Sequence, residues 1–84
     1  MIIYKYKLEM IEHQVIELPT NFKPLKIEFQ DKQLCMWAIV DLLNSRNNFN
    51  FYIIATGQEW FDSTPLKYIS TVFKDNFVWH IFYS

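Results

Sequence analysis

Hydrophobic and polar residues alternate along the first third of the chain. In residues 4–10, tyrosine, leucine and methionine occupy the even positions, and lysine and glutamate occupy the odd ones. A period of two is typical of a strand with one face buried and the other in water. A second short strand is expected at 14–18, where Pro19 stops it, and the alternation recurs at 25–30; Pro19 and Pro24 bracket the connection between these two stretches. The pattern therefore predicts three half-buried strands.

The stretch from Leu34 to Val40 is apolar at every position. In a strand, Leu34, Met36, Ala38 and Val40 face one way, and Cys35, Trp37 and Ile39 face the other. Such a strand is typically central, with one face on the core and the other against a second layer, a partner subunit or a ligand. A buried helix gives a similar run, but the short length and the β-branched residues favour a strand. The polar residues 31–33 then form the turn of a hairpin spanning 25–40.

The second half of the chain repeats this organisation after a polar interruption. Residues 42–50 are rich in asparagine and have no periodicity, which predicts a loop. A strand follows at 51–56 and ends at Gly57, and residues 58–66 are predicted to form a long loop, with a short helix as the alternative. A second hairpin is expected at 68–83.

Six to seven short strands, frequent turns and a single glycine indicate an all-β protein with one domain over residues 1–84. We expect an antiparallel meander that closes as a small barrel or a sandwich.

Aromatic residues make up 19% of the 84-residue chain, and hydrophobic residues make up 51%. A chain of this size hides only about 60–65% of the surface that it exposes when unfolded, so its core is thin. We therefore expect some rings to remain outside as a binding patch. Thin cores also gain stability by association, which predicts a homo-oligomer.

Charge and cysteine content exclude several classes of protein. The formal net charge is −1 and the pI is about 6.0, so generic nucleic-acid binding is not expected. The single cysteine, Cys35, lies in an apolar run and fits a reducing compartment. No apolar segment approaches the ~20 residues of a membrane span, and no signal sequence is evident. We predict a cytoplasmic protein without membrane contact.

Catalytic and metal sites find little support in the residues. One cysteine and two histidines, distant in sequence, do not provide the ligands of a zinc site. A pair of Cys35 and His80 lacks the polar setting that stabilises a thiolate. Asp41 closes a predicted strand and Asp62 lies in a predicted loop, and roles in turns and capping explain both carboxylates without catalysis. We expect no enzyme activity and no cofactor.

Candidate binding residues are aromatic or lie at the single glycine. Trp60 and Phe61 are adjacent, so their rings point in different directions and one is expected to be exposed. Thr56, Gly57 and Gln58 form either a plain turn or a place where backbone amides approach an anion. His80 is either a strand histidine hydrogen-bonded to a loop or a ligand contact. The proposed binding set also includes Trp37 and Trp79.

Several blocks of the chain resemble a family of small, mostly uncharacterised bacteriophage proteins. The blocks are LCMWAIVD at 34–41, the ATG of 55–57, YISTV at 68–72 and WHIF at 79–82, and the resemblance covers nearly the whole chain in the same order. Two positions depart from the family pattern: Lys32 replaces a hairpin glycine, and Gln58 replaces a frequent histidine. The first departure requires a different turn or a strained left-handed residue, and the second removes any role for a histidine there.

The resemblance implies a phage accessory protein that acts in the host cytoplasm by binding. The expected partner is a host defence protein, which the phage protein would block as a counter-defence inhibitor. The alternatives are a sponge for a nucleotide messenger of host immunity and a structural homo-oligomer.

Overall fold

A computed structural model describes residues 1–60 and 65–84 of the chain. The strands are β1 (Ile2–Lys7), β2 (His13–Pro19), β3 (Lys23–Gln30), β4 (Gln33–Val40), β5 (Arg46–Ala55), β6 (Lys67–Lys74) and β7 (Phe77–Tyr83). The all-β prediction is confirmed, and the described residues contain no helix, in particular none that could cross a membrane.

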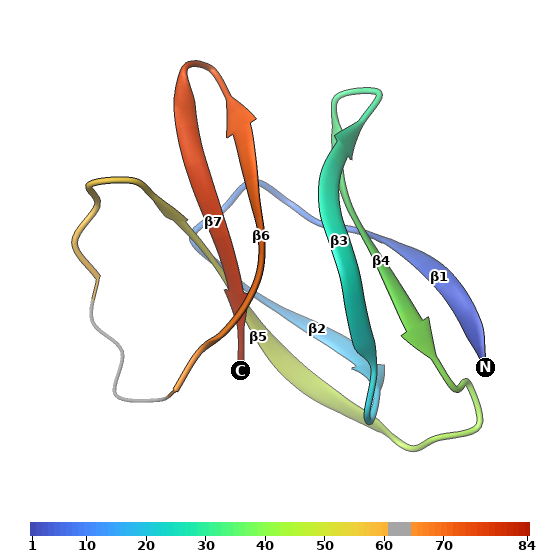
Figure 1. Cartoon of the computed structure of the whole chain (residues 1–84). Coiled ribbons are helices and arrows are strands. Elements are labelled where there is room, and N and C mark those ends of the chain that lie inside the picture. Colours follow the sequence, from blue (N-terminus) through green and yellow to red (C-terminus); the bar gives the residue numbers. More distant parts are fainter. Residues whose placement is uncertain (61–64) are drawn as a thin grey trace.

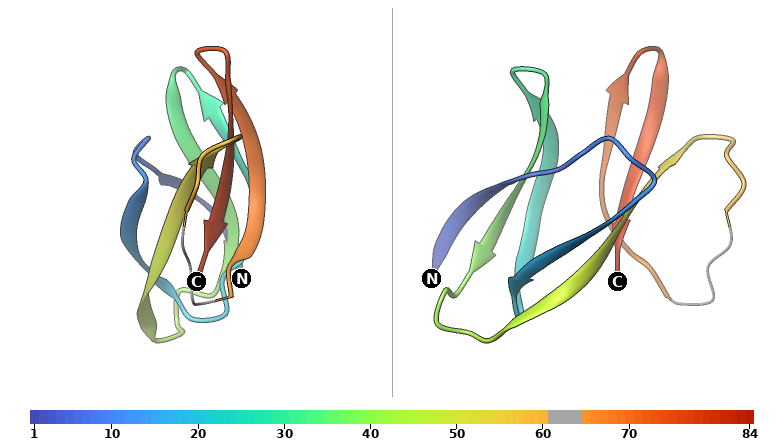
Figure 2. Two further views of the ribbon diagram at one scale, coloured as in Figure 1. Left: turned by 90° about the vertical axis from the view of Figure 1, so that its left-hand side faces the viewer. Right: turned by 180° about the vertical axis from the view of Figure 1, so that it is seen from behind.

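The strands form two antiparallel sheets that pack as a flat sandwich. One sheet has the order β1-β4-β3 and the other has the order β2-β5-β7-β6. The edge strands β3 and β6 lie side by side (Figure 1), and the backbone amide of Ile27 donates a hydrogen bond to Ser70 Oγ at 2.9 Å. The principal dimensions are 39 × 34 × 16 Å, and Figure 2 shows how thin the molecule is when turned on its side.

Strand pairing follows the chain order only in part. The two predicted hairpins are confirmed as β3–β4 and β6–β7. However, β1 pairs with β4 and β2 pairs with β5, although β1 and β2 are consecutive in the chain. The apolar strand β4 is central in its sheet, as its two hydrophobic faces predict.

The prediction of a loop over 42–50 is wrong for residues 46–50, which belong to β5. Their backbone pairs with β2, so that Asn48 lies opposite Glu17 and Asn50 lies opposite Val15. Within this segment Phe49 packs against the core. Backbone pairing to a neighbouring strand stabilises such a segment even when its own side chains show no hydrophobic alternation.

The core lies between the sheets and is filled mainly by aliphatic side chains. Leu18, Met36, Ala38, Phe51 and Ile81 have no exposed surface. Phe22 contacts Phe49 and Tyr83 at centroid distances of 4.8 and 5.0 Å, so a few rings are enough to fill one end of the core.

The turn of the β3–β4 hairpin contains two residues in the left-handed region, Asp31 at φ 50° and Lys32 at φ 68°. Of the two possibilities that the sequence left open at Lys32, a different turn or a strained left-handed residue, the structure has the second.

Candidate functional site

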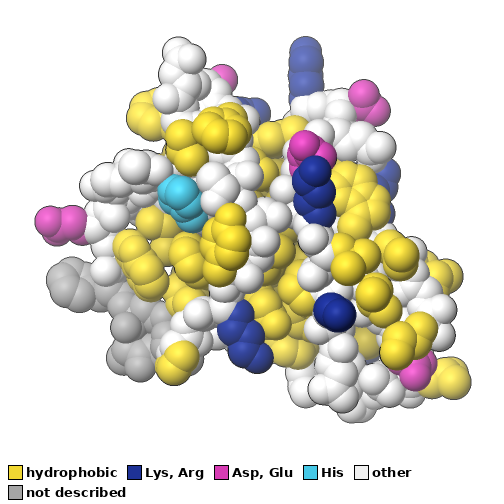
Figure 3. Space-filling view, viewed as in Figure 1, with side chains coloured by type: hydrophobic (Ala, Val, Ile, Leu, Met, Phe, Trp, Pro, Cys, Tyr) yellow, Lys and Arg dark blue, Asp and Glu magenta, His cyan; other side chains and the backbone are white. Residues whose placement is uncertain are grey.

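The outer side of the four-stranded sheet carries a cluster of rings, the aromatic face, made of Tyr52, Trp60, Tyr68 and Phe82, of which Trp60 and Tyr68 are exposed and the other two are partly exposed. Phe82 lies opposite both Tyr52 on β5 and Tyr68 on β6, so all three side chains leave the same side of the sheet. The centroid of Phe82 is 5.7 Å from that of Tyr68 and 5.9 Å from that of Trp60. In Figure 3, hydrophobic side chains gather over β6 and β7.

The rings of this face are accessible although they contact one another. Trp60 is 44% exposed and Tyr68 is 58% exposed, and Phe73, on the same side of β6, is 76% exposed. Rings held in place by neighbouring rings lose little conformational freedom when a partner covers them. The prediction that one of the adjacent residues Trp60 and Phe61 is exposed agrees with Trp60, whereas Phe61 lies outside the described residues.

Both histidines lie beside the aromatic face. The His13 ring stacks on Tyr52 at a centroid distance of 5.0 Å, and His13 Nε2 lies 2.9 Å from Asn50 Oδ1. His80 leaves the outer side of β7, as its position in the alternating pattern predicts. Its Nε2 lies 2.7 Å from Thr56 Oγ1 and its Nδ1 lies 3.1 Å from Thr71 Oγ1. Both ring nitrogens therefore have hydroxyl partners, which favours the reading of a strand histidine hydrogen-bonded to a loop.

The turn at 56–58 is closed by its own hydrogen bonds. Gly57 has φ 87°, a conformation that glycine adopts without strain. The backbone amides of Thr56 and Gln58 donate to Val78 O at 2.9 Å and to Ala55 O at 3.1 Å. The side-chain amide of Gln58 donates to Glu12 Oε1 at 2.8 Å, which brings a carboxylate to the turn. Two amides already bonded and a carboxylate nearby make this turn a poor anion site.

An open cavity of about 860 Å³ lies beside the connection between β1 and β2 and the adjacent ends of β5 and β7. Its apolar lining includes Met10, Ile53, Phe77 and Trp79, and Glu12 and Gln58 lie among its polar residues. The indole of Trp79 donates to Lys74 O at 3.3 Å. Two of the predicted binding residues, Gln58 and Trp79, therefore share a concave surface that is mainly apolar.

The structure divides the predicted binding residues among separate surfaces. Trp60 belongs to the aromatic face, and Thr56 and His80 border it. Gln58 and Trp79 line the cavity. Trp37 lies on the other sheet. Sequence reasoning missed Tyr52, Tyr68 and Phe82. The alternation in 77–83 does place Phe82 on the same side as His80, but only the pairing of β5, β7 and β6 brings the three rings together.

The described residues contain no group of three or more histidine, cysteine or acidic side chains placed to hold a metal ion. Fold and surface together define a small all-β sandwich protein with a cluster of aromatic rings on the outer side of one sheet. The chain belongs to the family DUF7352, a domain of unknown function, whose model matches residues 1–84. No curated protein and no solved structure matches the chain. The full-length family match agrees with the expected resemblance to an uncharacterised family, whereas a bacteriophage origin stays a prediction.

Proposed function

We propose that the protein acts by binding, without catalysis, and that its aromatic face docks on a protein partner. We further propose that the partner is a host defence protein, which a phage inhibits by this contact. The observation that carries the proposal is the pair of exposed rings, Trp60 and Tyr68, that pack on Phe82 on one side of a sheet. Aromatic rings dominate the energetics of protein interfaces because they bury much area at a small entropic cost.

The area available supports this proposal. Trp60 is 44% exposed and Tyr68 is 58% exposed. If each large ring presents roughly 100 Å² to a partner, its burial at about 25 cal/mol per Å² contributes about 2–3 kcal/mol. Two such rings are therefore enough to form the energetic centre of an interface of ordinary size, in which a few anchors supply most of the affinity.

The nucleotide sponge is the weaker alternative. A cyclic or linear nucleotide needs a partner for its phosphate, and the 56–58 turn was the candidate. The amides of Thr56 and Gln58 are already bonded there, and Glu12 adds a negative charge. A phosphate at this turn would meet like charge and would find two of the three backbone amides already bonded, so the geometry favours a protein over a nucleotide messenger.

The test combines capture from host lysate with protection of phage infection. The double variant Trp60→Ala/Tyr68→Ala is compared with Leu43→Ala, which removes another hydrophobic side chain that is 95% exposed and lies away from the aromatic face. We expect the wild type and Leu43→Ala to capture a defence protein and to protect the phage. The double variant is expected to lose both properties while its circular dichroism spectrum is unchanged.

Two outcomes would overturn the proposal. The first is capture and protection by the double variant at wild-type levels. The second is a wild type that forms a dimer in light scattering while the double variant is monomeric and no host protein is captured, because the aromatic face would then be a contact between copies of this chain.

A further inference from the structure

The outer side of the three-stranded sheet concentrates positive charge around a tryptophan. The register places Lys5 and Lys26 directly on either side of Trp37. Two residues along β4 from Trp37 in each direction, and on the same side of the sheet, Lys7 lies beside Cys35, and Lys23 lies beside Ile39. These four lysines and Trp37 form the lysine face.

The charge on this surface contrasts with that of the whole chain. The lysine face holds four of the eight basic residues of the protein. The register adds Glu28 to it, and at its edge Asp41 lines a pocket together with Lys23 and Ile39. Four lysines, one glutamate and one aspartate leave a formal charge of +2 here, whereas the chain as a whole carries −1. Because salt screens exposed charges beyond about 8–10 Å, acidic residues on the other sheet offset little of this local potential.

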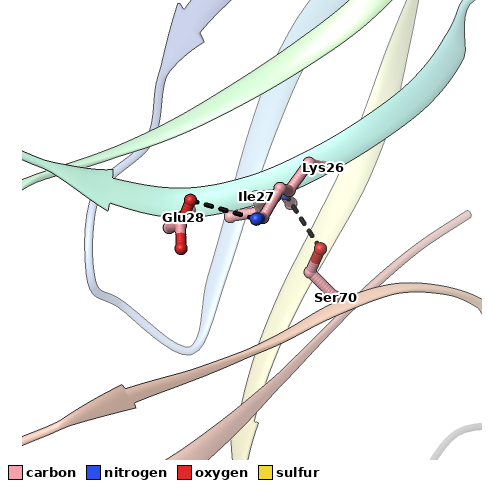
Figure 4. A network of polar contacts seen from close by, with 4 residues as sticks. All are labelled: Lys26, Ile27, Glu28 and Ser70. Carbon is pink, nitrogen blue, oxygen red and sulfur yellow. Dashed lines mark hydrogen bonds and ion pairs between the residues drawn. The ribbon is translucent and has the colours of Figure 1, made fainter.

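The side chains of the lysine face are available to a ligand. The four lysines are exposed and Trp37 is partly exposed, while the opposite side of β4 is closed by fully buried Met36 and Ala38. Lys5 Nζ donates to Gln30 Oε1 at 2.9 Å and so reaches across β4. Lys26 pairs with Glu28 at 3.2 Å (Figure 4), and both side chains are more than half exposed. Exposed pairs of this kind contribute about 0–1 kcal/mol, so an anion can replace Glu28 with little loss.

We infer that the lysine face binds single-stranded nucleic acid, with the indole of Trp37 stacking on one base and the lysines contacting the phosphates on either side of it. Neighbouring strands are about 4.8 Å apart, so the backbone positions of Lys5 on β1 and Lys26 on β3 are about 10 Å apart, with Trp37 between them on β4. A ring flanked by cations is the arrangement that proteins use for unpaired bases and their backbone. A duplex presents no free base to this ring.

This surface uses different residues from the aromatic face, although both faces border the same groove. The lysine face lies on β1, β4 and β3, and the aromatic face lies on the other sheet, with an open groove of about 420 Å³ between β3 and β6. In Figure 3, basic side chains lie over β3 and hydrophobic ones over β6 and β7. The variants that test one face change no residue of the other, so a negative result for one proposal does not decide the other.

Fluorescence anisotropy with a labelled oligothymidine of about 12 nucleotides tests the inference, since single-strand sites span about 4–16 nucleotides. Parallel arms use an oligouridine, a duplex of the same length and polyglutamate. We expect binding at low salt to the single strands, with DNA and RNA distinguished by their relative affinities, and weaker binding to the duplex and to polyglutamate. The logarithm of the affinity should fall with the logarithm of the salt concentration with a slope of about −2 to −3, as expected for up to four phosphate contacts at about −0.7 each.

Two variants separate the roles of the ring and of the charges. Trp37→Ala is expected to weaken binding by about 5- to 150-fold, the loss of one stacked base, while Trp37→Phe retains most of the affinity. Lys5→Gln/Lys26→Gln should lower the magnitude of the salt slope by about 1.4. The matched control is Lys67→Gln/Lys74→Gln on β6, which should leave the slope unchanged.

Three results would overturn the inference. One is the absence of binding to either single strand at 50 mM salt. Another is equal weakening by the β6 control and by the Lys5→Gln/Lys26→Gln variant. The third is tighter binding to polyglutamate or to the duplex, which would make the surface a docking site for acidic protein or for double-stranded nucleic acid.

Discussion

Replacing Ser70 by alanine tests how the two sheets are joined. Figure 4 shows the hydrogen bond from the backbone amide of Ile27 on β3 to Ser70 Oγ on β6, with a length of 2.9 Å. Ile27 is 1% exposed, and its side chain is part of the core. In Ser70→Ala the amide keeps its buried position but loses its acceptor.

The expected loss follows from the cost of an unpaired buried donor. Leaving a buried amide without a partner costs about 1–3 kcal/mol, which is more than the net value of an average hydrogen bond. A chain of this size unfolds with an m value of about 1 kcal/mol per molar urea. The midpoint of urea unfolding, followed by tryptophan fluorescence and by circular dichroism, should therefore fall by about 1–3 M with an unchanged m value.

Two further variants control this experiment. Ser70→Thr keeps a hydroxyl on a strand position and should recover most of the stability. Ser45→Ala removes an exposed hydroxyl that lies 3.4 Å from Thr20 Oγ1 and should change the free energy of unfolding by less than about 0.5 kcal/mol. If the midpoint of Ser70→Ala stays within the error of the wild-type value, the bond does not hold β3 against β6 and the reasoning is wrong.

Two other substitutions should stabilise the protein. Lys32 has φ 68° in the hairpin turn, so Lys32→Gly should raise the free energy of unfolding by about 0.5–1 kcal/mol; a lower melting temperature would contradict the left-handed assignment. The Tyr6 hydroxyl is buried without a hydrogen-bond partner among the described residues, and burial raises the pKa of Tyr6, although Arg46 lowers it part of the way. Tyr6→Phe should therefore be more stable by up to about 1 kcal/mol at neutral pH. Because the pKa of Tyr6 is raised on folding, the folded state keeps this proton to a higher pH than the unfolded state does, and the free energy of unfolding of the wild type falls above pH 10. The difference in the free energy of unfolding between Tyr6→Phe and the wild type should therefore widen above pH 10 in urea titrations. A constant difference across pH 9–11 would refute this linkage.

Local patterns account for most of the strands and for both hairpins. Alternation in a stretch such as 77–83 is a property of neighbouring residues, so it can be read without knowing the partner strand. Strand boundaries are less well determined. The alternation extends to residue 10, but β1 ends at Lys7. Leu8 is apolar because it packs in the core from the connection between β1 and β2, and not because the strand continues.

The candidate surfaces depend on contacts that no local pattern contains. Trp37 was recognisable as part of one face of a two-faced strand, but Lys5 and Lys26 lie beside it only because β1 and β3 both pair with β4. Tyr52 and Phe82 likewise meet only through the pairing of β5 with β7.

The sequence by itself determined that this protein is all-β, that β4 is central and that rings exceed what a small core can hold, because these properties follow from composition and from a two-residue period. Only the tertiary structure decided which rings and charges share a surface. Strand order and register are set by contacts between residues far apart in the chain, and shifting one strand by a single residue would turn its side chains to the opposite face.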